Sequence, residues 1–274
     1  MTPLIVPGLN PSDKEFQHLI ESPYLDEERR FLERLWEEYE PYADKQFRIE
    51  IASNFHRRFW EMYLTCALME NGFEPSPKTY QKGPDVCAKV NNRWTWFEAI
   101  APSGGEGPDA IFKPELDVGQ IEWFMIPEEK IILRYIAAVI VKSNGYMAYL
   151  NDGVVRSGDP YVIALNGRRV PYSNLDDDTP YIVKVLLYEG EIRKANDSLV
   201  STGIFYDKEY TGISGVLFSN SDLKNRPLRS GSEFIFVHNP LADNPIQKGW
   251  FSMGSEYWKD DNLIHKKDYG RDRA

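Results

Sequence analysis

The hydrophobic pattern of the first third of the chain has the period of α-helices. Apolar residues recur at helical spacing over residues 26–39, and Ser12-Asp13 supplies an N-cap for a shorter helix that ends near Ile20. A third helix is expected from about residue 46 to residue 71, because Gly72 is a usual residue just after a helix C-terminus. The second half of this helix is almost entirely apolar, which indicates that it is buried.

After Gly72 the period changes to that of β-strands. Residues 86–90 form a short strand-like run, and residues 94–100 have the aromatic and β-branched content of a central strand. Asn91-Asn92 lies between the two runs and predicts a two-residue hairpin turn. Residues 101–113 are rich in Gly and Pro and predict a loop.

The rest of the chain predicts mixed α/β structure. Residues 128–150 read as a helix with acidic residues in its first turn, and residues 181–188 are ambiguous between helix and strand. The last twenty residues are polar and are expected to be partly disordered. Further strands are expected at the apolar runs 161–166, 213–219 and 233–238.

This order of elements predicts an α/β fold in a single domain. The chain has 274 residues, enough for one large domain, and no long linker divides it. Within the domain 1–274 we expect an N-terminal helical segment (1–45), a central core (46–166) and a C-terminal mixed α/β extension (167–274).

Composition narrows the function classes. The net charge of −10 argues against a large, non-specific nucleic-acid surface but allows a local basic groove or a metal site. Two cysteines and four scattered histidines lack the spacing of a disulfide scaffold or a zinc site. No signal peptide and no run of about 18 apolar residues is visible, so a cytoplasmic protein with no membrane partner is expected.

Two acidic residues belong to the predicted hairpin. A two-residue turn places Val90 opposite Arg93, and the same count places Asp85 opposite Glu98. Directly opposed side chains have Cβ atoms about 4.5–5.5 Å apart, so the two carboxylates repel each other unless a cation lies between them. The ordinary alternative is that Asp85 is a turn residue and that Glu98 pairs with a Lys or Arg. A longer loop or a bulge would break the register.

Glu61 is a third acid in an apolar context, on the predicted third helix. Arg57 lies four residues before it and can form an ordinary helix ion pair with it.

At these residues the chain resembles the PD-(D/E)xK nuclease superfamily, which has the restriction-endonuclease-like fold. Gly83-Pro84-Asp85 looks like the PD element, and residues 97–100 fall where the acidic-x-Lys element belongs. The order of elements over residues 46–166 is similar to the superfamily's αβββαβ core. The resemblance implies that Asp85 and Glu98 hold Mg²⁺ (or Mn²⁺), with Glu61 assisting, and that the metal activates a water for attack on a phosphodiester.

One position departs from the motif, because Ile100 stands where the superfamily has its lysine. Some members take the lysine from the following helix, and Lys142 is the candidate there, preceded by the apolar residues 138–141. A lysine that extends from the helix to solvent is the ordinary alternative for it. Lys89 is a second candidate, since it shares a strand face with Asp85.

Three further features have ordinary explanations. The glycine-rich loop 103–107 lacks the Lys-Ser/Thr of a phosphate-binding loop, and His238 before a proline is typical of a hydrogen-bonded turn. A small basic cluster is formed by Lys224, Arg226 and Arg229; a solvated loop is its ordinary explanation, and a phosphate contact is the alternative.

The leading hypothesis is a metal-dependent endonuclease acting on DNA, in restriction or phage defence. The alternative is a catalytically inactive module that keeps the fold and binds nucleic acid or a protein partner, which Ile100 favours. A third hypothesis is an unrelated α/β enzyme in which the acidic pair does acid/base work. A double cut would suit a homodimer.

Overall fold

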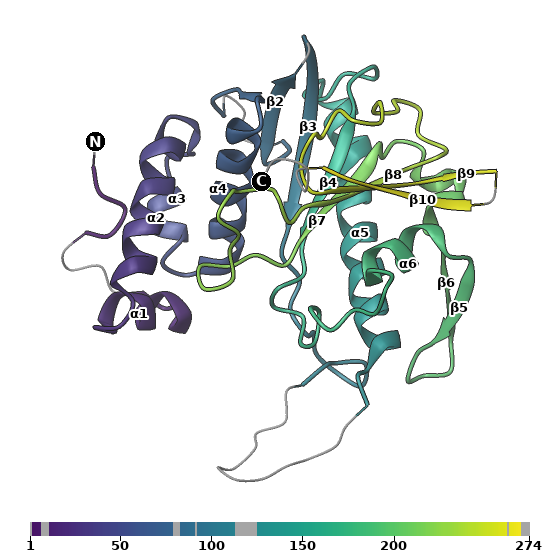
Figure 1. Cartoon of the computed structure of the whole chain (residues 1–274), viewed down its shortest axis with the longest axis horizontal. Coiled ribbons are helices and arrows are strands. Elements are labelled where there is room, and N and C mark those ends of the chain that lie inside the picture. Colours follow the sequence, from purple (N-terminus) through teal and green to yellow (C-terminus); the bar gives the residue numbers. More distant parts are fainter. Residues whose placement is uncertain are drawn as a thin grey trace.

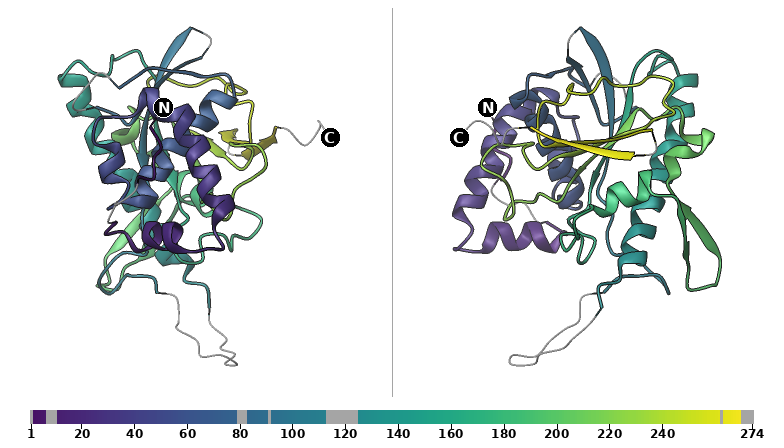
Figure 2. Two further views of the ribbon diagram at one scale, coloured as in Figure 1. Left: turned by 90° about the vertical axis from the view of Figure 1, so that its left-hand side faces the viewer. Right: turned by 45° about the vertical axis from the view of Figure 1, so that its right-hand side comes forward.

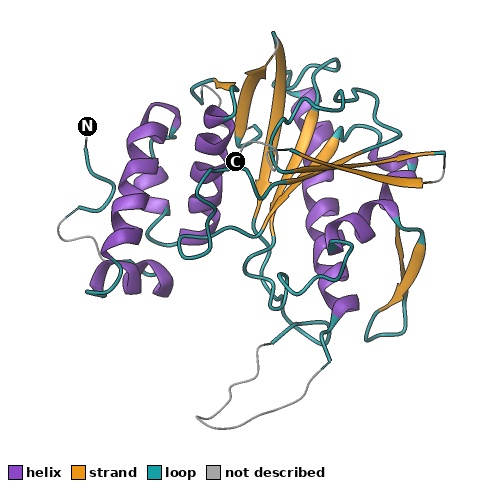
Figure 3. Cartoon of the chain, in the orientation of Figure 1, coloured by secondary structure: helices purple, strands orange, loops and turns teal. Residues whose placement is uncertain are grey.

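A mixed β-sheet covered by helices on both faces forms the body of the chain (Figure 1). In this computed structural model the described residues are 2–6, 11–78, 83–90, 92–112, 125–261 and 263–269. Helices α1–α4 lie on one side of the sheet, and α5 and α6 lie on the other, as the secondary-structure colouring makes clear (Figure 3). The α/β class expected from the sequence is therefore confirmed.

The N-terminal helices follow the sequence prediction closely. They are α1 (Lys14–Glu21), α2 (Asp26–Tyr39), the 3-10 turn η1 (Glu40–Tyr42), α3 (Phe47–Glu50) and α4 (Phe55–Glu70). The Asp13 carboxylate accepts hydrogen bonds from Glu15 N and Phe16 N, so it caps α1 as expected.

The single helix expected over 46–71 is wrong, because a turn over residues 51–54 divides it into α3 and α4. Ser53 and Asn54 favour turns and helix caps over helix interiors. Asp13 Oδ2 also accepts a hydrogen bond from Phe55 N (3.1 Å), which ties the first turn of α4 to the start of α1. In a continuous helix the Phe55 N–H would instead donate to a backbone carbonyl of the helix itself.

The sheet contains eight strands among the described residues. The first three strands are antiparallel neighbours, the third and fourth are parallel, and the fifth, β7, is parallel to the fourth. Beyond β7 the sheet is mixed. In spatial order the strands are β1 (Glu74–Pro75), β2 (Val86–Val90), β3 (Arg93–Ile100), β4 (Tyr161–Asn166), β7 (Gly215–Ser219), β8 (Ile235–His238), β9 (Ser255–Asp260) and β10 (Leu263–Asp268).

The helices after β3 cover the face of the sheet opposite α4. Helix α5 (Glu128–Asn151) connects β3 to its parallel neighbour β4, and α6 (Tyr181–Leu187) packs against α5. Two views turned about the vertical axis show α4 and α5 on opposite sides of the strands (Figure 2). A separate ribbon of β5 (Gly190–Arg193) and β6 (Leu199–Thr202) and the short turns η2 (Ile204–Tyr206) and η3 (Lys208–Tyr210) follow.

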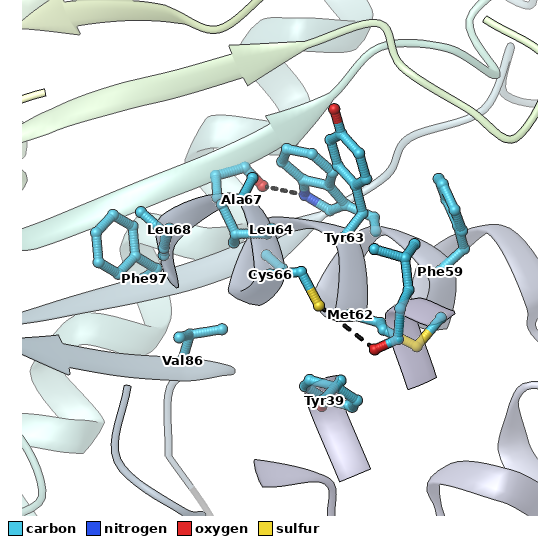
Figure 4. Packing of buried hydrophobic residues seen from close by; sticks show 14 of the residues in the cluster. Tyr39, Phe59, Met62, Tyr63, Leu64, Cys66, Ala67, Leu68, Val86 and Phe97 are labelled. Carbon is cyan, nitrogen blue, oxygen red and sulfur yellow. Dashed lines mark hydrogen bonds between the residues drawn. The ribbon is translucent and has the colours of Figure 1, made fainter. Parts of the chain in front are cut away.

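Each face of the sheet has its own apolar core. Alternate residues of the β2–β3 hairpin pack with α4, including Val86 and Phe97, as the close-up shows (Figure 4). The intervening residues, such as Trp96, pack with α5. The Trp60 indole N–H donates to Ala164 O (2.9 Å), which holds α4 against β4.

Helix α5 is, in the part of the chain that the structure describes, the helix long and apolar enough to cross a membrane by length and composition. Its buried side chains pack against the sheet and α6, as in a core helix of a globular protein, so this is weak evidence for a membrane span.

Most of the last twenty residues, which were expected to be partly disordered, lie in strands, and residues 262 and 270–274 lie outside the described residues. Residues 255–260 and 263–268 form β9 and β10, and β9 is hydrogen-bonded to β8 inside the sheet. Glu256 is fully buried, and Trp258 stacks on His265 across the hairpin. The neighbouring strand satisfies the backbone groups, so a polar segment can be ordered without a strong apolar pattern.

Candidate functional site

The hairpin register brings Asp85 and Glu98 opposite each other. Val90 pairs with Arg93 and Val86 with Phe97, so the next residue on each strand completes the predicted pair. Asn92 has φ of 66°, in the left-handed region that two-residue turns favour, and Asn91, the other residue of the predicted turn, lies outside the described residues. Asp85 lies just before β2, and its Oδ2 accepts a hydrogen bond from Ala99 N (2.8 Å). This bond fixes the Asp85 carboxylate against β3.

Lys142 of α5 contacts both members of the pair. Its ammonium group donates a hydrogen bond to Glu98 Oε1 and lies 3.9 Å from Asp85 Oδ2. The lysine side chain is largely buried, so the alternative in which it extends freely to solvent is wrong. One cation from the next helix thus already lies within reach of both carboxylates.

Glu61 does not lie on the same face of the sheet as this pair. It belongs to α4, whereas strand alternation directs Asp85 and Glu98 away from the α4 core that Val86 and Phe97 enter. Lys78 joins the two regions, because its Nζ is 3.2 Å from Glu61 Oε1 and 3.9 Å from Asp85 Oδ1. Sequence reasoning missed Lys78, which stands in no motif.

The partners of Glu61 also differ from the expected helix pair. Arg58, not Arg57, donates to Glu61 Oε2 (2.7 Å), and the Tyr39 hydroxyl donates to Oε1 (3.0 Å). Glu61 is 2 % exposed, and a buried carboxylate needs such donors. With both oxygens engaged, Glu61 positions Lys78 rather than offering a free ligand oxygen.

Glu98 is the most perturbed acid of the site. It is 5 % exposed, and burial together with the adjacent Asp85 raises its pKa to about 7, although Lys142 and Tyr149 oppose the shift. Glu98 Oε2 is buried and accepts no hydrogen bond of ordinary geometry from the described residues, although the Tyr149 hydroxyl lies close enough to Glu98 to lower its pKa. A carboxyl group of this kind changes its protonation state readily near neutral pH and has an oxygen available to a ligand.

Lys89 lies away from the pair. Its Nζ is 5.8 Å from the centroid of the Trp94 ring, and Lys89 is four residues along β2 from Asp85, a separation of roughly 13 Å. Ile100 ends β3 and packs at the edge of the α5-side core. Of the two lysines named from the sequence, Lys142 is therefore the one that meets the carboxylate pair.

The other features noted in the sequence have local structural roles. Ser103 O accepts a hydrogen bond from Arg134 Nε (2.9 Å), and the ring of His238 is 3.7 Å from Glu256. In the basic cluster, Arg226 lies over the Phe31 ring at 4.2 Å and Arg229 donates to Asn71. These contacts explain the positions of Arg226 and Arg229 without any bound ligand. They do not involve Lys224.

The side-chain donors at the site decide whether a metal ion fits there. No group of three His, Cys, Asp or Glu side chains is arranged to hold a metal ion within the described ranges. Asp85 and Glu98 still present hard oxygen ligands, including Glu98 Oε2, and these suit Mg²⁺ or Mn²⁺ with water completing the coordination. The pair therefore fits a divalent cation, with Glu61 outside the direct ligand set.

A cavity of about 260 Å³ opens beside this site and is lined by Asp85 and Lys78 among other residues. The arrangement thus combines two opposed carboxylates, a lysine shared between them and a neighbouring space for a ligand. Comparison with known protein families, curated proteins and solved structures finds no match to this chain.

Proposed function

We propose that the chain is a metal-dependent phosphodiesterase that cleaves DNA. The observation that carries the proposal is the contact of one ammonium group, Lys142, with both Asp85 and Glu98. A lysine beside two opposed carboxylates is the set of groups that phosphodiester hydrolysis needs: ligands for a metal and a positive charge for the phosphate.

The order of elements supports the same proposal. Helix α4 is followed by three antiparallel strands (β1, β2 and β3), by the crossover helix α5 and by the parallel strand β4. This is the αβββαβ order that resemblance to the PD-(D/E)xK superfamily implies, with Lys142 supplied by α5 in place of a lysine at Ile100.

Each residue has a separate part in this chemistry. Asp85 and Glu98 would hold the Mg²⁺ or Mn²⁺ ion, which would polarise the phosphodiester and lower the pKa of a bound water. The Ala99 N–H keeps Asp85 oriented, and Lys142 neutralises charge that develops on the phosphate. Lys78 and Glu61 position Asp85 from the side of the sheet facing α4.

The test is cleavage of plasmid DNA with Mg²⁺ or Mn²⁺. Lys142→Ala is expected to lower the cleavage rate by about 10²-fold, the scale for removing one transition-state charge stabiliser, with nearly unchanged metal affinity. The matched control is Lys130→Ala on the same helix, because Lys130 donates to backbone carbonyls of Pro108 and Ala110. Absence of cleavage by the wild type with either metal contradicts the proposal. Equal cleavage by Lys142→Ala contradicts the role of this lysine.

The alternative is a catalytically inactive module that binds nucleic acid or a protein. Ile100 in the usual lysine position and the engagement of all three acids by Lys or Arg favour it. DNA binding without cleavage in the same assay would identify this alternative. The nuclease proposal also includes a role in restriction or phage defence, a cytoplasmic location and a homodimer that makes a double cut.

A further inference from the structure

The cavity beside Asp85 is lined by the β2–β3 hairpin, which projects at the top of Figure 1, by the turn after α5, and by residues of α2, η1, α4 and the segment 75–78. Its volume is about 260 Å³. Its lining includes the aromatic residues Trp94 and Trp96, the cations Lys78 and Arg156, and the acid Asp85 of the candidate site.

The aromatic wall is partly open to solvent. Trp94 is 38 % exposed, and Lys89 Nζ lies 5.8 Å from the centroid of its ring. Trp96 is held in place because its indole N–H donates to Asp159 Oδ2 (3.0 Å). Burial raises the pKa of the adjacent Cys87 thiol to about 12, so this side chain is neutral and adds to the apolar wall. The wall therefore offers a flat, accessible π-surface.

Two cations, Lys78 and Arg156, line the cavity together with two acids, Asp85 and Asp159. Arg156 is exposed, and its guanidinium has no ion-pair or hydrogen-bond partner among residues 2–6, 11–78, 83–90, 92–112, 125–261 and 263–269. Lys78 lies on the Asp85 side of the same cavity. In a chain of net charge −10, an unpaired arginine beside an exposed tryptophan is a local exception to the acidic surface.

We propose that this cavity receives one unpaired nucleotide of the DNA strand on which the Asp85–Glu98 pair acts. The base stacks on Trp94, and the adjoining phosphate meets Arg156. Stacking on aromatic rings with a cation on the backbone is the general mode of single-strand recognition and does not depend on base identity. The inference rests on the proposed function, because the strand is the substrate of that function. It adds a preference for DNA that is single-stranded or locally unpaired.

The experiment measures binding of a fluorescent oligothymidylate of about ten nucleotides by anisotropy, with chelator present so that no cleavage occurs. Trp94→Ala is expected to raise the Kd about tenfold, and Trp94→Phe to restore most of the affinity because it keeps a stacking ring. Arg156→Ala is expected to weaken binding and to reduce the salt dependence by about one phosphate contact.

The matched controls lie far along the chain. Trp258→Ala removes a half-buried tryptophan of β9, and Arg193→Ala removes an exposed arginine of β5. Both are expected to leave the Kd unchanged. An equal loss of affinity in Trp94→Ala and Trp258→Ala, or no binding by the wild type, overturns the cavity assignment.

Failure of the cavity assignment can be distinguished from failure of the nuclease proposal. Plasmid cleavage without any dependence of oligonucleotide binding on Trp94 contradicts the cavity assignment alone. Binding that depends on Trp94, in a protein that cuts nothing with Mg²⁺ or Mn²⁺, supports the cavity as a nucleotide site and contradicts the nuclease.

Discussion

Buried charge at single residues organises the candidate site. Glu98 stands inside an apolar strand, and such a carboxylate is costly unless a cation or hydrogen-bond donors meet it. Lys142 meets it from α5, and the same rule accounts for Arg58 and Lys78 beside Glu61. The requirement for a partner could be predicted from the sequence, and so could Lys142, because both residues lie in strongly patterned elements.

Lys78 could not be predicted in the same way. It follows Pro75, Ser76 and Pro77, in a stretch with neither helical nor strand periodicity. Its position depends on how the chain leaves β1 and passes the edge of the sheet, which is decided by tertiary packing. The failure to name Arg58 has a smaller cause, since pairs at i,i+3 and i,i+4 are equally compatible with helix geometry.

Asp85→Asn tests whether the pair is strained in the absence of metal. With chelator present, the change is expected to be neutral or slightly stabilising, because it removes repulsion from Glu98 while the asparagine oxygen still accepts from Ala99 N. Asp85→Ala loses this acceptor and is expected to cost about 1 kcal/mol of unfolding free energy. Thermal melts measure both. A loss of several degrees in Asp85→Asn would instead make Asp85 a structural ion-pair partner of Lys78 and Lys142.

At the scale of elements, the hairpin is the part of the site that the sequence predicts best. Its register follows from strand alternation and a two-residue turn, and both are local properties. The bounds of α2 and β4 are local in the same sense, and the structure agrees with them. By contrast, the division between α3 and α4 and the strands β9 and β10 depend on partners distant in sequence, namely Asp13 and β8. Patterns within a segment cannot report such partners.

Asn92→Val tests the dependence of the site on the turn. Asn92 has φ of 66°, which a β-branched residue tolerates poorly, so this change is expected to cost about 1–2 kcal/mol. Asn92→Gly is the matched control and is expected to be neutral or stabilising, since glycine adopts positive φ without strain. Chemical denaturation measures the difference. Equal stability of the two variants would show that the turn does not constrain the register of Asp85 and Glu98.

At the scale of the molecule, the sheet unites the segments that the sequence separates. Strands from residues 74–166 and from residues 215–268 are neighbours in it, so β7–β10 of the C-terminal extension continue the same sheet, while β5 and β6 pair in a separate ribbon. The carboxylate pair lies where α5 crosses β3, whereas the buried His56 lies on α4. His56 therefore reports the stability of the whole fold, independently of the acidic pair.

His56 Nε2 contacts Asn166 Oδ1 at 3.2 Å, at the end of β4. The same oxygen accepts from Arg168 N, and the Asn166 amide donates to Ser221 O, so His56 Nε2 acts as the donor. One neutral imidazole thus links α4, β4 and the segments that follow β4 and β7. Burial, followed by the nearby Arg169, lowers the pKa of His56 to about 4.

This lowered pKa makes the fold sensitive to acid. Between pH 6.5 and 4 the unfolded chain binds a proton at this position that the folded chain does not, so the free energy of unfolding falls as the pH falls through this window. The contribution is fully present above pH 6.5, and a shift of this size corresponds to about 3 kcal/mol at most.

His56→Gln keeps a donor for Asn166 and cannot be protonated. Its melting temperature relative to wild type is therefore expected to be constant from pH 7.5 to about 6.5 and to rise as the pH is lowered further to 4.5. His18→Gln, on the exposed face of α1, is the control and should follow the wild type at every pH. Parallel curves for His56→Gln and wild type would show that His56 does not carry the acid sensitivity of the fold.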